Sequence, residues 1–280
     1  MSILSSIEGK LKAKDGTEIY YVKDVPNDRK AVVVIVHGFA EHLGRYDYVK
    51  NKLNEFGYGV YRFDNRSHGK SGGERGHIED YNNFIEDANL VVDMAKKENT
   101  DVPIFMLGHS MGGFITSSYG IRYGEKLDGQ VLTDAATMKT PQVTGIKGPL
   151  FKLLSKIIPK KRIENPLSHL ICHDRKVVKD YEEDPLNLND ATIKFFVEFM
   201  VNGVGWLNEN MPSYSCPCLI LHGGDDKIVD KRASENFYKT IASNDKEIKI
   251  YDGLYHEILN EDIKDDILED IHKWLERHIS

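Results

Sequence analysis

The chain has 280 residues, of which 40% are hydrophobic and 29% are charged, values that describe an ordinary globular protein. Its length allows one α/β domain that carries an insertion. The net charge of −7 argues against a general surface for nucleic acid or for anionic membranes, although it leaves local basic patches open. The composition therefore excludes disordered and fibrous classes, and we expect no nucleic-acid partner.

The N-terminal ten residues, MSILSSIEGK, lack the basic segment and the apolar core of a secretory signal. The longest apolar runs, such as 31–36, are far shorter than the ~20 residues that a membrane helix needs. Three cysteines, Cys172, Cys216 and Cys218, form no disulfide framework and fit a reducing compartment. We therefore expect a cytoplasmic location, and the absence of paired C-x-x-C spacing predicts no metal site.

Strand-like runs alternate with helical patterns along most of the chain. Runs at 10–14 and 17–25 flank the turn-forming pair Asp15-Gly16 and predict an antiparallel edge hairpin. Further strands of a mostly parallel sheet are predicted at 31–36, 60–63, 104–107, 131–133, 218–221 and 248–251. Amphipathic helices around 84–95 and 263–275 should pack on this sheet. This alternation is typical of the α/β class.

Residues 138–207 interrupt the alternation, because no strand-like run occurs among them. We interpret them as a helical cap inserted into a core made of residues 1–137 and 208–280. A helix beginning near Pro149 would place apolar and basic side chains on separate faces. The apolar set is Leu150, Leu153, Leu154, Ile157 and Ile158, and the basic set is Lys152, Lys156 and Lys160. Such a helix either docks transiently on a lipid surface through its apolar stripe or packs on the body with its lysines in solvent.

The segment Gly108-His-Ser-Met-Gly112 directly follows the predicted strand at 104–107. A serine between two glycines at a strand-to-helix turn is the nucleophile elbow, which holds the serine Oγ over the edge of a sheet. The glycines at 108 and 112 let neighbouring backbone pass without a Cβ in the way. The pattern predicts a serine hydrolase with Ser110 as its nucleophile.

Serine needs a base to act as a nucleophile, and the base needs an orienting acid. In this architecture the acid follows a late strand. Asp226, in the loop after the strand at 218–221, is the preferred acid, and its neighbour Asp225 is interpreted as a turn former. Asp134, after the strand at 131–133, is the alternative.

The base should come last in the chain order Ser, Asp, His. Among the histidines beyond Asp226, His256 lies in a loop just past the last predicted strand. His272 and His278 lie in the C-terminal helix and are interpreted as surface residues. His256 is therefore the predicted base.

Backbone N–H groups must stabilise the oxyanion that forms when an acyl group is attacked. One donor should be Met111, the residue after the nucleophile, and the second should come from the loop after an early strand. Phe39, in His37-Gly-Phe39, is the candidate for the second donor. His37 itself is expected to brace this loop.

Several runs resemble the monoacylglycerol lipase and lysophospholipase family of α/β hydrolases, whose members carry a helical cap. They are HGFAEHLGRY at 37–46, DNRSHGKSGGER at 64–75, GHSMGG at 108–113, YEEDPL at 181–186 and YHE at 255–257. The similarity extends from about residue 8 to the C-terminus. It implies that Ser110, Asp226 and His256 form the triad, and that Phe39 and Met111 form the oxyanion hole.

The same resemblance implies a substrate-binding role for three further residues. Arg45 and His109 match positions near the polar end of the family's pocket, and Tyr181 matches a tyrosine of the cap. For Arg45, a structural ion pair with Glu41 or another acid is an equally open interpretation. Val177 occupies the position of a glutamate near the glycerol head group in vertebrate members.

The sequence thus predicts ester hydrolysis through an acyl-enzyme, without a metal or organic cofactor. Monoacylglycerols or lysophospholipids with medium or long acyl chains are the expected substrates. Short-chain carboxylesters and aminopeptidase-like amides are the alternative substrates. From a different class, a non-catalytic ligand-binding protein that retains the scaffold is the remaining alternative.

Overall fold

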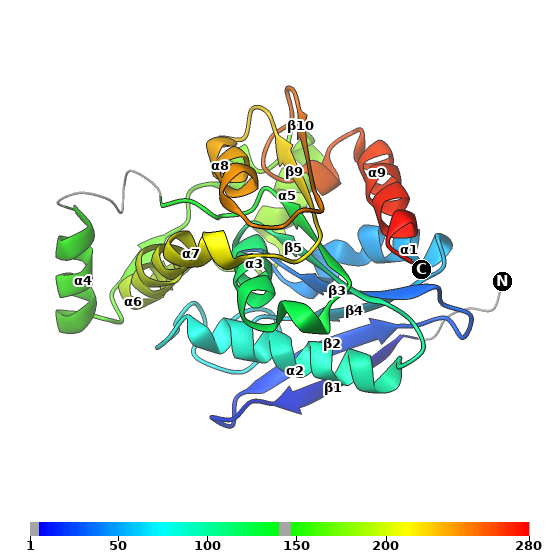
Figure 1. The fold of residues 1–280 in the computed structure, drawn as a ribbon. Coiled ribbons are helices and arrows are strands. Elements are labelled where there is room, and N and C mark those ends of the chain that lie inside the picture. The colour runs from blue at the N-terminus through cyan, green and yellow to red at the C-terminus, as the bar shows by residue number, and fades with distance from the viewer. Residues whose placement is uncertain (1–5, 140–146, 280) are drawn as a thin grey trace.

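The computed structural model describes residues 6–139 and 147–279, and its centre is an eight-stranded sheet (Figure 1). The strand order is β1-β2-β4-β3-β5-β6-β9-β10. These strands are β1 (Ile7–Lys12), β2 (Glu18–Asp24), β3 (Ala31–Val36), β4 (Tyr58–Phe63), β5 (Ile104–His109), β6 (Gly129–Thr133), β9 (Cys218–Gly223) and β10 (Lys246–Tyr251). Strand β2 is antiparallel to β1 and β4, and all other neighbours are parallel. The predicted mostly parallel sheet with its antiparallel edge hairpin is confirmed.

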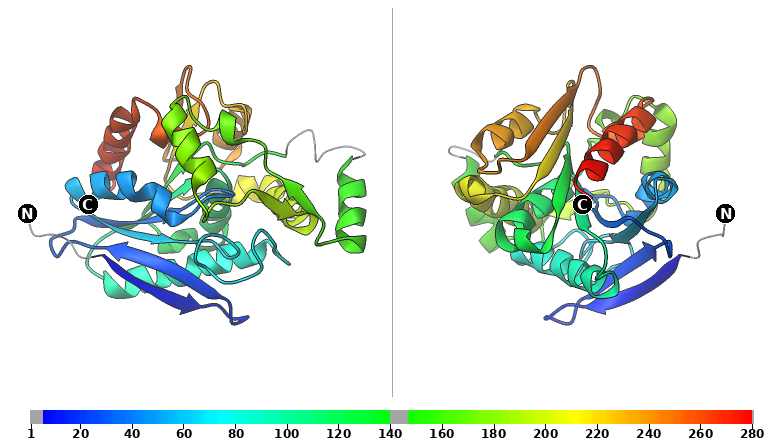
Figure 2. Two further views of the ribbon diagram at one scale, coloured as in Figure 1. Left: turned by 180° about the vertical axis from the view of Figure 1, so that it is seen from behind. Right: turned by 45° about the vertical axis from the view of Figure 1, so that its right-hand side comes forward.

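Helices cover both faces of the sheet. They are α1 (Asp47–Glu55), α2 (Asn82–Glu98), α3 (Met111–Tyr123), α8 (Arg232–Thr240) and α9 (Lys264–Arg277). Every residue of β3 is buried, and successive side chains point to opposite faces. Val34 joins the core formed with α2 and α3, whereas Val33 joins the core formed with α1 and α9. Figure 2 shows α1 and α9 together on one side of the sheet, the two-sided burial expected of an α/β fold.

Between β6 and β9 the chain leaves the sheet. The elements there are α4 (Lys147–Ile157), β7 (Arg162–Glu164), α5 (Arg175–Glu183), β8 (Asp190–Thr192), α6 (Ile193–Phe196), a π-helical segment (Val197–Gly203) and α7 (Val204–Asn210). Short 3-10 turns occur at Leu43–Tyr46, Gly124–Lys126, Ser168–Leu170, Met211–Ser213 and Ile258–Asn260. Residues 140–146 of the predicted cap lie outside the described residues, as do residues 1–5 of the N-terminal segment.

The prediction of no strand within 138–207 is wrong, because β7 and β8 pair antiparallel with Arg162 opposite Thr192. Each strand has only three residues, which is too short to show the alternation that marks a strand in a sequence. The Arg162 guanidinium donates to Asp190 Oδ1 through Nε at 2.8 Å and Nη2 at 2.6 Å. A salt bridge between residues 28 positions apart in the chain thus links β7 to β8.

Helix α4 stands at the periphery, against α6 and the π-helical segment (Figures 1 and 2). Four residues of its predicted apolar face are exposed, namely Leu150 (54%), Leu153 (54%), Ile157 (66%) and Ile158 (43%). The interpretation of a helix whose apolar side packs on the body is therefore wrong for these four residues. The side of α4 that carries the buried Ser155 is covered instead, so the apolar stripe faces solvent. Within the described ranges, no helix is long and apolar enough to cross a membrane.

Candidate active site

Ser110 lies at the junction of β5 and α3 with φ 54° and ψ −116°, outside the regions that side chains usually occupy. A Cβ on Gly108 would lie 2.2 Å from Thr116 Oγ1, and one on Gly112 would lie 2.0 Å from the carbonyl oxygen of Val36. Helix α3 can approach β3 and β5 this closely only because both positions lack a side chain. The turn therefore has the geometry of a nucleophile elbow.

Three side chains from separate loops meet at the elbow. Ser110 Oγ lies 2.9 Å from His256 Nε2, and His256 Nδ1 lies 2.7 Å from Asp226 Oδ2. Asp226 follows β9 and His256 follows β10, so the parallel strands deliver both residues to the same edge of the sheet. Asp226 Oδ1 accepts hydrogen bonds from the backbone N–H groups of Ile228 at 2.7 Å and Val229 at 3.0 Å. The structure thus brings together the three residues predicted to act as nucleophile, base and acid.

The charge of Asp226 and the proton on His256 stabilise each other. Burial alone would lower the pKa of His256, but the charge of Asp226 and the hydrogen bond between them outweigh burial and raise this pKa. Burial likewise raises the pKa of Asp226, and His256 and His222 outweigh it so that this pKa falls. Each partner stabilises the ionised form of the other. The pair therefore favours the imidazolium that a histidine becomes when it takes a proton from serine.

Among the described residues, neither alternative acid forms a hydrogen bond with His256. The Asp225 side chain is exposed, and its backbone N–H donates to Leu254 at 2.9 Å. Asp134 is fully buried, and its Oδ1 accepts from the Gly223 N–H at 2.8 Å. Asp134 Oδ2 has no hydrogen-bond partner among the described residues, and burial raises the pKa of this carboxyl to about 7. Asp226 is thus the carboxylate that contacts His256 directly, with Asp134 close behind it.

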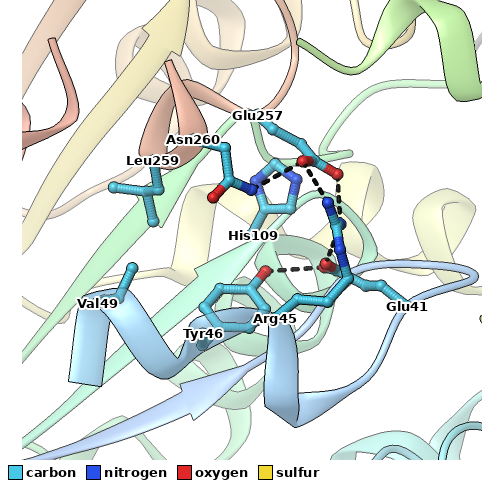
Figure 3. A pocket seen from close by; sticks show the side chains of 8 residues that line it. All are labelled: Glu41, Arg45, Tyr46, Val49, His109, Glu257, Leu259 and Asn260. Carbon is cyan, nitrogen blue, oxygen red and sulfur yellow. Dashed lines mark hydrogen bonds and ion pairs between the residues drawn. The ribbon is translucent and has the colours of Figure 1, made fainter. Parts of the chain in front are cut away.

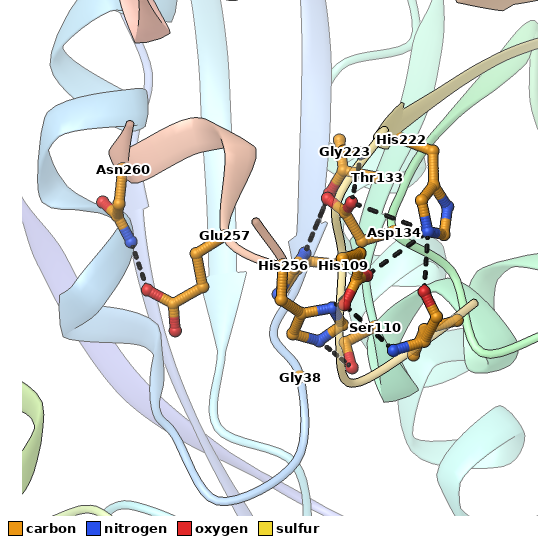
Figure 4. A network of polar contacts seen from close by, with 12 residues as sticks. Gly38, His109, Ser110, Thr133, Asp134, His222, Gly223, His256, Glu257 and Asn260 are labelled. Atoms are coloured by element: carbon orange, nitrogen blue, oxygen red, sulfur yellow. Dashed lines mark hydrogen bonds and ion pairs between the residues drawn. The ribbon is translucent and has the colours of Figure 1, made fainter. Parts of the chain in front are cut away.

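Figure 4 shows Asp134 beside the histidines of this network. One ligand atom from each of Asp134, Asp226 and His256 lies within 4.8 Å of the others, so these residues could surround a metal ion. Such an ion would replace the hydrogen bond between Asp226 and His256.

His272 in α9 and His278 just after it are half-buried, so their rings are partly covered by neighbouring side chains. His272 stacks on Phe56 with ring centroids 4.2 Å apart, and its Nδ1 lies 2.7 Å from the Tyr58 hydroxyl. His278 stacks on Trp274, and its Nε2 lies 2.9 Å from Asp245 Oδ2. His272 thus connects α9 to Phe56 and Tyr58, whereas His278 stacks within the end of the helix and connects it to Asp245.

The predicted oxyanion donors flank the serine. Phe39 lies in the loop after β3, and Met111 is the first residue of α3. Within residues 6–139 and 147–279, neither backbone N–H donates to a protein acceptor. The first N–H groups of a helix have no partner in the helix and lie at its positive end, where an anion is stabilised. Both N–H groups are therefore available to a developing oxyanion.

His37 braces the loop that carries Phe39. Its Nδ1 donates to the carbonyl oxygen of Gly38 at 2.7 Å, and its Nε2 accepts from the Asn65 N–H at 2.8 Å. Complete burial lowers the pKa of His37 to about 3, so the ring is neutral and can accept at Nε2. This geometry fits the bracing role expected for His37.

A pocket lies next to Ser110, and residues from the segment between β6 and β9 form part of its lining. Its lining consists of Gly38, Phe39, Glu41, His109, Ser110, Asn165, Leu167, Ile171, Tyr181, Ile228, His256 and Glu257. Two of the three predicted substrate-binding residues, His109 and Tyr181, are in this set. The Tyr181 hydroxyl donates to the carbonyl oxygen of Ala40 at 3.2 Å and accepts from Asn165 Nδ2 at 3.3 Å. His109 Nδ1 lies 3.1 Å from Thr133 Oγ1, and burial lowers the pKa of this histidine to about 4.

Arg45, the third residue, lines a small neighbouring cavity and turns its guanidinium to two carboxylates (Figure 3). It pairs with Glu41 and, through both terminal nitrogens, with Glu257. The ion-pair interpretation of Arg45 is therefore realised, and its role as a substrate contact stays a prediction. Sequence reasoning gave no role to Glu257, although an acid directly after the predicted base was visible in the chain.

A mostly parallel sheet, helices on both faces and a Ser-His-Asp arrangement at the carboxyl edge of the strands define the α/β hydrolase class. The family model described as "Serine aminopeptidase, S33" matches residues 27–263, and the chain belongs to this family.

Three relatives confirm the resemblance to monoacylglycerol lipases. The chain is 33% identical over 265 residues to monoacylglycerol lipase of Mycolicibacterium smegmatis, and the match covers 93% of each chain. It is 30% identical to monoglyceride lipase of Mus musculus, over 90% of this chain and 84% of that protein. The crystal structure of Paleococcus ferrophilus monoacylglycerol lipase superimposes with a TM-score of 0.82 at 31% identity, covering 93% of this chain and 99% of the other.

Proposed function

We propose that the protein is a serine hydrolase of carboxylic esters that acts on monoacylglycerols or lysophospholipids with medium or long acyl chains. The observation that carries this proposal is the chain of hydrogen bonds from Ser110 through His256 to Asp226, at 2.9 and 2.7 Å. Ser110 and His256 also line the pocket described above. The monoacylglycerol lipases among its relatives support the choice of substrate class.

The proposed reaction begins when His256 Nε2 takes the proton of Ser110 Oγ as that oxygen attacks the ester carbonyl. The negative oxygen of the tetrahedral intermediate accepts hydrogen bonds from the N–H groups of Phe39 and Met111. Asp226 stabilises the imidazolium, which then gives its proton to the departing alcohol. A water molecule, activated by the same histidine, attacks the acyl-enzyme and releases the fatty acid. No step in this cycle calls for a metal or organic cofactor.

Apolar side chains near the nucleophile support an acyl chain as the occupant of the pocket. The Phe39 ring packs on Phe195 and Phe196 of α6, at centroid distances of 5.1 and 5.4 Å. Phe39 itself lines the pocket, together with the three aliphatic side chains Leu167, Ile171 and Ile228. Burial of each methylene contributes about 0.8 kcal/mol, so long chains would gain most from it.

Polar residues of the pocket support contact with an alcohol group. His109 and Tyr181 stay our proposed substrate contacts, and Arg45 lies behind them in the neighbouring cavity. Val177, at the position of the family's head-group glutamate, packs in an apolar cluster with Ile171 and Tyr181. We therefore propose that head-group selection here does not depend on a carboxylate at that position.

We propose that residues 138–207 form the cap and that α4 docks it on an anionic lipid surface. The exposed stripe of Leu150, Leu153 and Ile157 would enter the interface, and the exposed Lys152 and Lys156 beside it would contact lipid head groups. This contact would bring the pocket close to a substrate embedded in the lipid.

The three cysteines are free and buried, and burial raises the pKa of each thiol to about 12. Thiols of this kind are unreactive, and the cytoplasmic location stays a proposal.

Labelling with a fluorophosphonate probe tests the proposed nucleophile. The wild type should be labelled and Ser110→Ala should not. Ser117→Ala, which removes another buried serine hydroxyl from α3, is the matched control and should be labelled normally. A folded wild type that stays unlabelled would favour the non-catalytic alternative.

A substrate panel then separates the remaining alternatives. Monoacylglycerols, lysophospholipids, p-nitrophenyl esters and aminoacyl amides should be compared across acyl-chain length. Preference for chains shorter than about six carbons would replace the lipid proposal by a short-chain esterase. Faster turnover of amides would point to the aminopeptidase activity in the family's description.

A further inference from the structure

We infer that Glu257 is a positioning residue. It acts through Arg45 to fix the position of the histidine loop, which carries His256, relative to the oxyanion loop, which carries Phe39. This inference rests on the proposed function, because it concerns how the same site is kept in its reactive geometry. The residues that carry it form one buried cluster of two carboxylates around one guanidinium (Figure 3).

Arg45 makes three charge-assisted contacts in this cluster. Its Nη1 and Nη2 donate to the two oxygens of Glu257 at 2.5 and 2.8 Å, and Nη1 also lies 2.9 Å from Glu41 Oε2. The three side chains are at most 10% exposed. Bidentate contacts between arginine and carboxylate are strong and fix orientation, and burial protects them from screening.

Each carboxylate of the cluster is attached to a different part of the proposed machinery. Glu257 directly follows His256, and its Oε2 also accepts from Asn260 Nδ2 at 2.8 Å. Glu41 Oε1 accepts from the backbone N–H of Gly38, the residue before the proposed oxyanion donor Phe39. Arg45 therefore joins the histidine loop, through Glu257, to the oxyanion loop, through Glu41.

The cap contacts both loops as well. The Tyr181 ring lies 4.8 Å from the guanidinium of Arg45, and its hydroxyl donates to the carbonyl oxygen of Ala40. Ala40 has a φ of 62°, a left-handed conformation that its surroundings must hold in place. The backbone N–H of Glu257 donates to the carbonyl oxygen of Ile171 at 2.7 Å. The cluster thus lies where the oxyanion loop, the histidine loop and the cap meet.

Loss of Arg45 would leave two buried carboxylates without a cation, and their repulsion would push the loops apart. A displacement of about 1 Å at a reacting group costs roughly 100-fold in rate, and loss of one oxyanion donor costs about 10²–10³-fold. Loss of the Glu257 charge is milder, because Arg45 keeps Glu41 as a partner. We expect kcat to fall about 100-fold in Arg45→Met and about 10-fold in Glu257→Gln by the same reasoning.

The test compares these variants on a monoacylglycerol and on the p-nitrophenyl ester of the same medium-chain acid. Only the first substrate carries a glycerol group. A positioning role predicts equal losses of kcat on both substrates, with KM changed less than about threefold because ground-state binding is retained. An increase of KM for the monoacylglycerol alone would show that Arg45 is a substrate contact and would overturn the inference.

The double variant Glu257→Gln with Arg45→Met tests whether the two residues act together. Residues of one network are not additive, so kcat should fall about 100-fold rather than the roughly 1,000-fold of independent effects. Arg45→Lys, which keeps the charge but loses the bidentate fork, should retain more activity than Arg45→Met. Unchanged kcat in Glu257→Gln would overturn the inference even if Arg45→Met does not fold.

Arg66→Met is the matched control for the general destabilisation that follows when a buried arginine–carboxylate pair is lost. Arg66 makes a similar buried bidentate pair, with Asp87 of α2 at 2.6 and 2.8 Å, away from the pocket beside Ser110. This variant should lower stability and leave kcat of the folded enzyme unchanged. An equal loss of kcat in Arg66→Met would overturn the inference. Failure of the proposed function is distinguishable, because the wild type itself would then not turn over either ester.

Discussion

Replacement of Asp226 by asparagine removes the charge behind His256 while it preserves the size of the side chain. The asparagine oxygen can still accept from the N–H groups of Ile228 and Val229, so the loop should keep its shape. The amide NH₂ would then face His256 Nδ1, where the carboxylate accepts a hydrogen bond of 2.7 Å. A donor at that place favours the tautomer with hydrogen on Nε2, so the ring can no longer accept the proton of Ser110.

The expected size of the loss follows from these two effects. A hydrogen bond to a charged group contributes about 1.5–3 kcal/mol, and the unfavourable tautomer adds a barrier of similar size. Together they raise the activation free energy by about 3–6 kcal/mol, or roughly 10²–10⁴-fold in kcat at 1.36 kcal/mol per factor of ten.

The assay is kcat and kcat/KM on a soluble p-nitrophenyl ester between pH 5 and pH 9. Because Asp226 raises the pKa of His256, the acidic limb of the remaining activity should move to lower pH. Asp225→Asn changes the adjacent exposed carboxylate and should keep near-normal rates. A kcat of Asp226→Asn within about tenfold of the wild type would refute the assigned acid, since removal of such an acid costs about 10⁴-fold.

Three further outcomes are expected. Gly112→Ala should lower the melting temperature by more than about 10 °C in circular dichroism, because its Cβ would lie 2.0 Å from a backbone oxygen. Gly124→Ala, with 3.7 Å of space, should lower it far less, and equal losses would contradict this steric argument. Asp134 loses its proton near pH 4 when unfolded but near pH 7 when folded, so wild-type stability falls as pH rises between these values. Asp134→Asn should therefore gain in thermal stability over the wild type as pH rises from 4 to 7, and a constant difference would contradict this. The double variant Leu153→Glu with Ile157→Glu replaces two exposed apolar side chains of α4. It should reduce the fraction of protein that floats with anionic vesicles, and it should reduce hydrolysis of vesicle-bound substrate relative to that of a soluble ester. Unchanged flotation would exclude docking through α4.

Local patterns in the sequence were sufficient for most of the core. The apolar runs of β3 and β5 predicted buried parallel strands, because a strand covered on both faces needs hydrophobic residues at successive positions. The run at 108–112 predicted the elbow, because the steric demand for glycine is local. The loop after a late strand favoured Asp226 as the acid, and the chain order Ser, Asp, His favoured His256 as the base; the fold brings these two residues together with Ser110.

Other features depended on packing between distant segments. Arg45 was compatible with a substrate contact or an ion pair, and only the fold placed Glu257, 212 positions away, against its guanidinium. The apolar stripe on α4 was equally compatible with a buried and an exposed position. In the fold, α6 and the π-helical segment contact α4, and the stripe stays exposed to solvent.

The sequence by itself therefore determined the α/β class, the position of the elbow serine and the order of its partners. These follow from backbone sterics and from hydrophobic periodicity over a few residues. The tertiary structure decided which charges pair, which face of the cap helix stays in solvent, and that the short strands β7 and β8 form. These features depend on contacts between residues far apart in the chain, which no local pattern records.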